Sequence, residues 1–191
     1  GYLLFTDVPG NKMWKWSEKG GLEKFLDPSG AATFDPNIWR EAGANGLAIY
    51  DANSILLADT GNRGIQRLDL ATKKKTPVAM SFEGKKFSSP NDVVKMRNGV
   101  LFFTDPPFGL PKFYDDPRKE LAFSGVYRTH RGRTTLLNSD LKGPNGIAFA
   151  PGGKQLYVGN WDPQHKVVLR FPVRRDGTLG ASETFVDLTQ E

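Results

Sequence analysis

Three asparagines carry the side chains best suited to binding a metal ion or a substrate in this sequence. Asn45, Asn91 and Asn145 each open a short apolar run, which is followed by a turn and a second, more apolar run. Side-chain amide oxygens are hard, neutral donors that suit Ca²⁺ or Mg²⁺, and three of them together could surround one ion. Asn-Gly is also a common turn signal, so Asn45 and Asn145 fit a turn equally well, whereas Asn91 is followed by Asp92 and fits it less well.

The asparagines recur because they belong to a repeat. The second run of each unit ends on a closing residue, and the closing residues are Asp7, Asp59, Asp105 and Asn160. The opening asparagine precedes the closing residue by 14 positions in two units and by 15 in the third, and the closing residues follow one another after 52, 46 and 55 positions. Repeats of this length that contain several short strands are typical of β-propeller blades.

The fold class predicted is therefore all-β, with strands of four to seven residues separated by turns rich in Gly, Pro, Asn and Asp. The chain holds about three full units and one that lacks its start. The opening strand of every propeller blade lines the central channel, so we expect Asn45, Asn91 and Asn145 to converge there from separate blades.

Two longer segments interrupt the repeat. Residues 28–44 form a connection for which we expect Phe34, Ile38 and Trp39 as anchors, and it is either a rim over one end of the ring or a packed connector. Residues 106–123 are an insertion in the third unit that contains several prolines, so we expect a loop there.

Composition excludes several kinds of site. The absence of cysteine rules out a disulfide framework, a thiolate metal site and a Cys nucleophile. The two histidines, His130 and His165, have no zinc or triad motif near them. A formal net charge of +5 permits attraction to anionic ligands but does not require it.

The densest basic run, Lys73 to Lys75, lies where a hairpin turn is expected, so we interpret it as a solvated loop and expect no nucleic-acid partner. No apolar run is long enough to span a bilayer. We expect a soluble protein without a membrane partner. The compartment (cytoplasmic, or periplasmic and secreted) and the oligomeric state stay open.

Several stretches resemble a known family. Ser89–Val94 (Ser-Pro-Asn-Asp-Val-Val) followed by Phe103–Gly109 (Phe-Thr-Asp-Pro-Pro-Phe-Gly) resembles the signature of the gluconolactonase, or senescence-marker-protein-30-like, family of calcium-dependent six-bladed β-propellers. Gly143–Ala148, and Phe171–Val173 with Asp176–Gly180, are similar to later stretches of that family. The resemblance covers nearly the whole chain, although strictosidine-synthase-like, paraoxonase-like and phosphotriesterase-type propellers share parts of the motifs.

The resemblance implies a fold and a metal site. Residues 1–191 would form a single, partial domain of a six-bladed propeller, about four blades, with the inner strand of the first blade and the last blades absent. The ion, Ca²⁺ or another divalent cation, would be held by a Glu from the first blade, Asn side chains from middle blades and an Asp from a later blade. Asn145 matches the family's metal-ligand Asn, and Asn91 matches an Asn that contacts the metal, or the substrate and its water.

The resemblance also implies calcium-dependent hydrolysis of a lactone, such as a sugar lactone. The ion would polarise the carbonyl and the later Asp would activate water. We expect the Glu before Gly1 and that Asp after Glu191, so we assign no catalytic residue within the chain. Since two neutral amides bring no charge, we expect residues 1–191 alone to bind Ca²⁺ weakly and to turn over little lactone.

Substrate contacts are assigned to Asn91, Asn45 and Asp105. Asp105 is also one of the closing residues, which recur in every unit. This recurrence favours a structural role for the closing position, such as fixing the turn that follows it. The family's Arg two positions before Asn91, seen in some members, is Ser89 here, which leaves the preference for sugar lactones open.

Two alternatives remain. Asn45–Ile49 with Ala58–Leu68 is similar to an NHL repeat, whose propellers often serve as binding scaffolds without catalysis. An ester or phosphotriester hydrolase on the same scaffold is the other.

Overall fold

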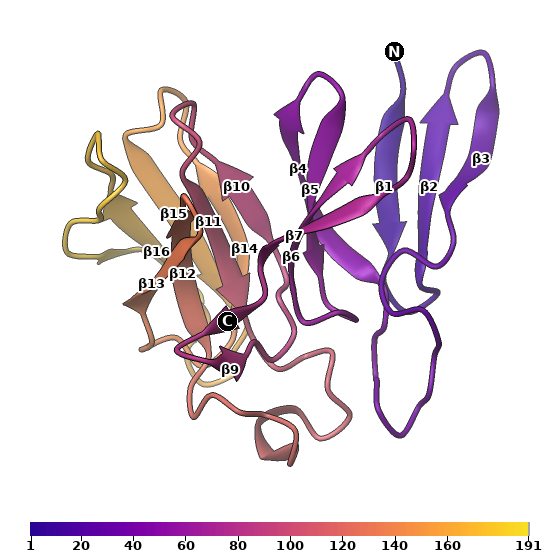
Figure 1. The fold of residues 1–191 in the computed structure, drawn as a ribbon. Helices are drawn as coiled ribbons and strands as arrows, with labels where there is room; N and C mark the ends of the chain where they lie inside the picture. Colours follow the sequence, from indigo (N-terminus) through magenta and orange to yellow (C-terminus); the bar gives the residue numbers. More distant parts are fainter. Residues whose placement is uncertain (191) are drawn as a thin grey trace.

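The computed structural model describes residues 1–190, in which four antiparallel sheets of three or four strands are arranged side by side (Figure 1). The first sheet has three strands, β1 (Leu3–Asp7), β2 (Lys12–Ser17) and β3 (Gly21–Leu26). The second has β4 (Ala44–Asp51), β5 (Ser54–Asp59), β6 (Gly64–Asp69) and β7 (Lys75–Ala79). The third has β10 (Val93–Lys95), β11 (Leu101–Asp105), β12 (Gly125–His130) and β13 (Arg133–Asn138). The fourth has β14 (Pro144–Phe149), β15 (Gln155–Asn160), β16 (Val167–Pro172) and β17 (Glu183–Asp187).

The strands of each sheet pair in chain order, as blades of a propeller do. The opening strands β4, β10 and β14 lie next to one another, and β1 lies against β4. The all-β, partial-propeller prediction is therefore confirmed, including the shorter first unit. The number of blades in a closed ring and the single-domain boundary stay predictions.

After β7, a small hairpin of β8 (Ser81–Phe82) and β9 (Lys85–Lys86) forms a separate two-stranded sheet. The insertion 106–123 is a loop as expected, apart from the short 3-10 helix η1 (Phe113–Asp115). Within residues 1–190 there is no helix with the length and apolar character needed to cross a membrane.

The second strands of the second and third blades, β5 and β11, lack polar alternation because they are buried on both faces, whereas β15 of the fourth blade is fully buried on one face only. In β5, Ile55 and Leu57 lie in an apolar cluster with Met13 of the first sheet, whereas Leu56 lies in a cluster with Phe103 of the third sheet. Alternate residues of a strand point to opposite faces, so one apolar strand supplies two inter-blade cores. Full burial of each such leucine contributes about 1.5–3 kcal/mol.

Each opening asparagine lies at a β-bulge, where two residues of the opening strand face one residue of the neighbouring strand. The three bulges are Asn45 and Gly46 facing Ala58, Asn91 and Asp92 facing Thr104, and Asn145 and Gly146 facing Gly159. The interpretation of the two Asn-Gly pairs as turns is therefore wrong, since both lie inside strands. Bulges redirect side chains and are frequent beside active sites.

Threonine hydroxyls tie the opening strands to the preceding blades. Thr6 Oγ1 donates a hydrogen bond to the Asn45 carbonyl at 3.0 Å, and Thr104 Oγ1 donates one to the Asn145 carbonyl at 2.6 Å. Asp92 adds a second tie between the third and fourth blades, because its Oδ2 accepts a hydrogen bond from Ile147 N at 3.0 Å. These bonds fix the backbone of each asparagine relative to its neighbour.

Between the second and third blades, the Gly46 N–H donates to the Asn91 carbonyl at 2.8 Å. A Cβ atom on Gly46 would lie 2.2 Å from Asp92 Oδ1 and 2.7 Å from Asp92 Cα. Glycine is therefore required at this position for the two opening strands to approach each other. Gly146 has no comparable neighbour.

The closing residues hold backbone N–H groups, in keeping with a structural role. Asp7 Oδ1 accepts from Gly10 N, and Asn160 Oδ1 accepts from Gly143 N at 2.9 Å. Asp105 is fully buried, and its two oxygens accept hydrogen bonds from Ser88 N and Ser89 N, both at 2.8 Å.

Asp105 gives the stability of the fold a predicted pH dependence. Burial raises the pKa of Asp105 to about 7, against the two N–H donors and Arg63, which lower it. Since the folded-state pKa lies above the ordinary 3.8, the unfolded chain loses this proton first, and the free energy of unfolding falls as pH rises from about 4 to about 7. We expect Asp105→Asn to remove this pH-dependent component, measured by denaturant unfolding between pH 4 and 8. The control is Asp115→Asn, at an exposed position, which should leave the change of the free energy of unfolding with pH as it is in the unaltered protein. If Asp105→Asn also leaves that change unaltered, the pH dependence does not come from Asp105.

Candidate functional site

Asn91 and Asn145 line one cavity of about 180 Å³, although they lie on separate blades. The structure thus brings together the two asparagines predicted as metal ligands, while their role as ligands stays a prediction. The other lining residues are Arg40, Glu41, Phe108, Phe113 and Trp161. A larger cavity of about 490 Å³ lies elsewhere, beside residues 95–98, and neither a carboxylate nor an opening asparagine lines it.

The other two predicted site residues lie outside this cavity. Asn45 is on the β4 bulge, where its carbonyl binds Thr6, and its side chain is not part of the lining. Asp105 is buried, with both carboxylate oxygens engaged by the N–H groups of Ser88 and Ser89, so it lies away from the cavity lining. The substrate contacts of Asn45 and Asp105 stay predictions, and the burial of Asp105 favours the structural role.

An aromatic wall covers one side of the cavity. Phe108 and Trp161 pack edge to face with ring centroids 5.1 Å apart, and Phe113 lies 6.3 Å from Phe108. The Trp161 side chain remains 60% exposed. A partly exposed wall of this kind can pack against the apolar face of a small ring-shaped ligand.

The aromatic residues were missed by the sequence analysis, although a signal for them exists. Trp161 directly follows the closing Asn160, which pairs with Pro144 beside Asn145. Residues just after a closing position must therefore reach the end of the sheet where the asparagine lies. Gly143 permits this approach, because a Cβ atom there would lie 2.5 Å from the Trp161 carbonyl oxygen and 2.9 Å from the Phe108 ring.

Arg40 and Glu41 bring the long connection to the edge of the cavity. Their N–H groups both donate to the Gly109 carbonyl, at 2.9 and 3.3 Å, and Arg40 Nη1 donates to the Phe108 carbonyl at 2.9 Å. Arg40 also lies over the Phe113 ring, 4.9 Å from its centroid, and pairs with Glu41 Oε1 at 2.7 Å. Of the two interpretations of residues 28–44, the rim fits this geometry.

Two of the three expected apolar anchors of this connection are wrong, because Phe34 and Ile38 are 52% and 43% exposed. Trp39 is partly buried, and Ala42 is fully buried. Ala42 is confined between Gly30 and Gly61, on each of which a Cβ atom would lie 1.9 Å from the Ala42 carbonyl oxygen. Close backbone packing at Ala42 therefore helps to hold the segment.

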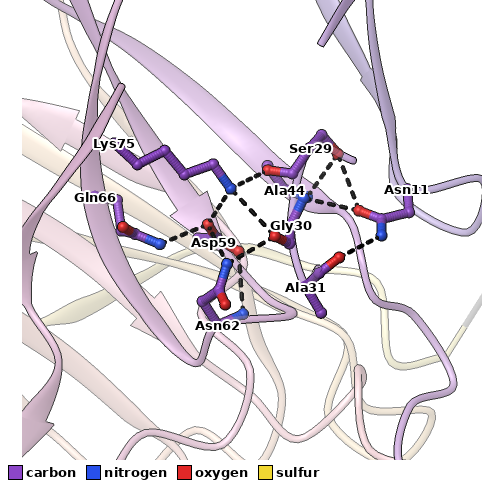
Figure 2. Close-up of polar contacts among 9 residues, drawn as sticks. All are labelled: Asn11, Ser29, Gly30, Ala31, Ala44, Asp59, Asn62, Gln66 and Lys75. Atoms are coloured by element: carbon purple, nitrogen blue, oxygen red, sulfur yellow. Dashed lines mark hydrogen bonds and ion pairs between the residues drawn. The ribbon is translucent and has the colours of Figure 1, made fainter. Parts of the chain in front are cut away.

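A polar network fixes the start of the connection (Figure 2). Asn11 Oδ1 accepts from Gly30 N at 2.7 Å and Asn11 Nδ2 donates to the Ala31 carbonyl at 2.8 Å. Lys75 Nζ donates to the Ser29 and Gly30 carbonyls and pairs with Asp59 Oδ2 at 2.7 Å. The first blade and β7 are thereby both tied to the same short segment.

Asp59 is the centre of this network. Its side chain is fully buried, and Asn62 and Gln66 donate to it as well as Lys75, as Figure 2 shows. The interpretation of Lys73 to Lys75 as a solvated loop is therefore wrong for Lys75, which lies on β7 with a side chain 17% exposed. Partner groups on all sides allow the carboxylate to be buried.

The second loop, 106–123, closes against the first. Arg118 Nη1 donates to the Ile38 carbonyl, and the same guanidinium binds Asp116 through Nε at 2.9 Å and Nη2 at 2.7 Å. This hydrogen bonding holds the pKa of Asp116 well below its usual range. The two insertions thus contact each other and jointly carry Arg40, Glu41, Phe108 and Phe113 to the cavity.

Comparison with known proteins identifies the family. The model of the SMP-30/gluconolactonase/LRE-like region matches residues 1–191. The chain belongs to this family. A curated gluconolactonase from Zymomonas mobilis is 40% identical over 163 residues, which are 84% of this chain and 46% of that protein.

Solved structures agree with the assignment. A gluconolactonase from Xanthomonas campestris matches with a TM-score of 0.78 and 29% identity, over 96% of this chain and 58% of that one. A calcium-binding protein, regucalcin, from Agrobacterium tumefaciens matches with a TM-score of 0.67 and 19% identity, over 98% of this chain and 56% of that one, and shares the fold. The chain spans about half the length of the curated gluconolactonase and somewhat more of these two structures.

The buried ion pair gives a direct test of how the connection is held. We expect Lys75→Met to lower the free energy of unfolding by about 3–5 kcal/mol, because it leaves Asp59 buried without its cation. The matched control is Lys74→Met, at the exposed neighbouring position, which should change it by less than about 0.5 kcal/mol. Chemical denaturation measures both, and equal effects of the two substitutions would show that the ion pair contributes nothing specific.

Proposed function

We propose that the protein is a lactone hydrolase that acts on a small sugar lactone with the help of a divalent cation, preferably Ca²⁺. The observation that carries the proposal is the cavity that Asn91 and Asn145 line together, in a chain matched along its whole length by the gluconolactonase family.

The donors in the cavity fit a hard cation. The side-chain oxygens of Asn91 and Asn145 would hold the ion, since Ca²⁺ prefers carboxylate and amide oxygens. Residues 1–190 contain no group of three or more His, Cys, Asp or Glu that could hold a metal. Tight binding then requires carboxylates from outside these residues, which agrees with the weak affinity expected for residues 1–191 alone.

The residues present explain how a lactone would be held. When bound, the cation supplies Lewis-acid polarisation of the lactone carbonyl. The side-chain amide of whichever asparagine faces the substrate can donate a hydrogen bond through Nδ2 to a ring or carbonyl oxygen. Phe108 and Trp161 pack against the ring and limit the access of water from that side. No residue of the cavity is assigned as the general base.

The two alternatives differ in how well they account for the chain. An NHL-type binding scaffold rests on residues 45–68 alone, whereas the family match extends over residues 1–191. An ester or phosphotriester hydrolase would use the same cavity and the same cation. Substrate comparison separates it from a lactonase.

The test is to compare hydrolysis of D-glucono-1,5-lactone, 4-nitrophenyl acetate and paraoxon by the protein at its natural length. We expect the lactone to be hydrolysed fastest, the activity to be lost on chelation with EDTA, and CaCl₂ to restore it, because the cation polarises the scissile carbonyl. Faster turnover of the aryl ester or the phosphotriester would overturn the lactonase proposal. Full activity in EDTA would overturn the metal requirement.

A further inference from the structure

Glu41 is the carboxylate among residues 1–190 that lines the cavity beside Asn91 and Asn145. Its side chain is 19% exposed, and Arg40 holds one of its oxygens, Oε1, at 2.7 Å. The ion pair leaves Oε2 without a donor within residues 1–190. Glu41 therefore has a free, charged hydrogen-bond acceptor at the edge of the cavity, and neither the metal site nor the lactone chemistry proposed above uses it.

The backbone around Glu41 is fixed on both sides. Before it, the N–H groups of Arg40 and Glu41 bind the Gly109 carbonyl; after it, Ala42 is fully buried and its carbonyl accepts from Ala31 N at 2.8 Å. A Cβ atom on Gly109 would lie 2.4 Å from Thr60 and 2.8 Å from Ser89, so a larger residue there would displace the loop. This degree of fixation suits a residue that must orient a ligand.

The chemistry of the cavity indicates what this acceptor binds. A carboxylate oxygen accepts hydrogen bonds from hydroxyl groups, the asparagine side chains both donate and accept them, and the aromatic wall packs against an apolar ring face. The pairing with Arg40 offsets the charge of Glu41, so its carboxylate is a weaker candidate for a metal ligand than a free one. A small ring that carries several hydroxyl groups satisfies all three features.

We propose that Glu41 is a specificity-determining residue that accepts hydrogen bonds from the hydroxyl groups of a polyhydroxylated lactone, with Arg40 as its positioning residue. This inference rests on the proposed function. It adds that the preference for hydroxylated over unsubstituted lactones originates in residues 28–44, a segment outside the propeller repeat.

The kinetic test compares D-glucono-1,5-lactone with δ-valerolactone, which has the same lactone ring without hydroxyl groups. A hydrogen bond to a charged group contributes about 1.5–3 kcal/mol, so Glu41→Gln should raise KM for the hydroxylated lactone about 10-fold or more. It should leave kcat/KM for δ-valerolactone within about 2-fold, and Glu41→Asp should retain part of the preference. Glu18→Gln, at an exposed turn position, removes the same charge and should leave KM and kcat/KM unchanged for both lactones. An equal loss on both lactones, as a merely structural role predicts, overturns the proposal.

A binding measurement separates this inference from the proposed function. Saturation-transfer NMR with 1,5-anhydro-D-glucitol, a hydroxylated ring without a lactone carbonyl, needs no catalysis. We expect a signal with the unaltered protein and with Glu18→Gln, and a loss of signal with Glu41→Gln at an unchanged thermal unfolding midpoint. Binding that depends on Glu41 without lactone hydrolysis would contradict the proposed function alone. If the protein hydrolyses the lactone but Glu41→Gln still binds 1,5-anhydro-D-glucitol as the unaltered protein does, this inference alone is contradicted.

Discussion

The hydrogen bonds between successive opening strands are the constraint on which the candidate site depends. Gly46 binds the Asn91 carbonyl, Thr104 binds the Asn145 carbonyl, and Asp92 reaches across to Ile147. Because each asparagine is on a bulge, its carbonyl is available for these contacts in place of regular pairing within its own blade. The distance between Asn91 and Asn145 is thus determined by inter-blade bonds, and any cation shared by the two would depend on them.

Two insertions complete the site, and polar contacts hold them. Residues 28–44 are attached through Asn11, Lys75 and Asp59 at one end and through the Gly109 carbonyl at the other. The exposed Phe34 and Ile38 contribute little by comparison. Hydrogen bonds to backbone carbonyls specify position more sharply than apolar contacts do, which suits a segment whose purpose is to present Arg40 and Glu41.

Much of the fold could be predicted from the sequence, because the repeat is local. The apolar runs that end at Asp59, Asp105 and Asn160 are β5, β11 and β15. β5 and β11 lack alternation because each is buried between two inter-blade cores, whereas β15 contributes to one core only. The convergence of Asn91 and Asn145 followed from the same repeat. The bulges did not, since Asn-Gly is a turn signal in most sequences and its position inside a strand depends on the pairing partner.

The rest of the site required tertiary information. Glu41 and Phe108 belong to loops whose paths are set by contacts between residues far apart in the sequence, such as Arg118 with Ile38, and no local pattern encodes them. The role of Asp105 is undecided by the sequence for a related reason. A carboxylate in each repeat can serve chemistry or hold the backbone, and only the positions of Ser88 and Ser89 decide between these roles.

The most direct test of the central claim is to locate the cation. Crystals of the protein at its natural length, grown with Mn²⁺ as an anomalous substitute for Ca²⁺, would give an anomalous difference map in which the ion appears as a peak. We predict a peak within direct bonding distance of both Asn91 Oδ1 and Asn145 Oδ1, that is, at or slightly below the roughly 2.3–2.6 Å of Ca²⁺–oxygen bonds, because Mn²⁺ is the smaller ion. A peak whose ligands include neither asparagine would contradict it.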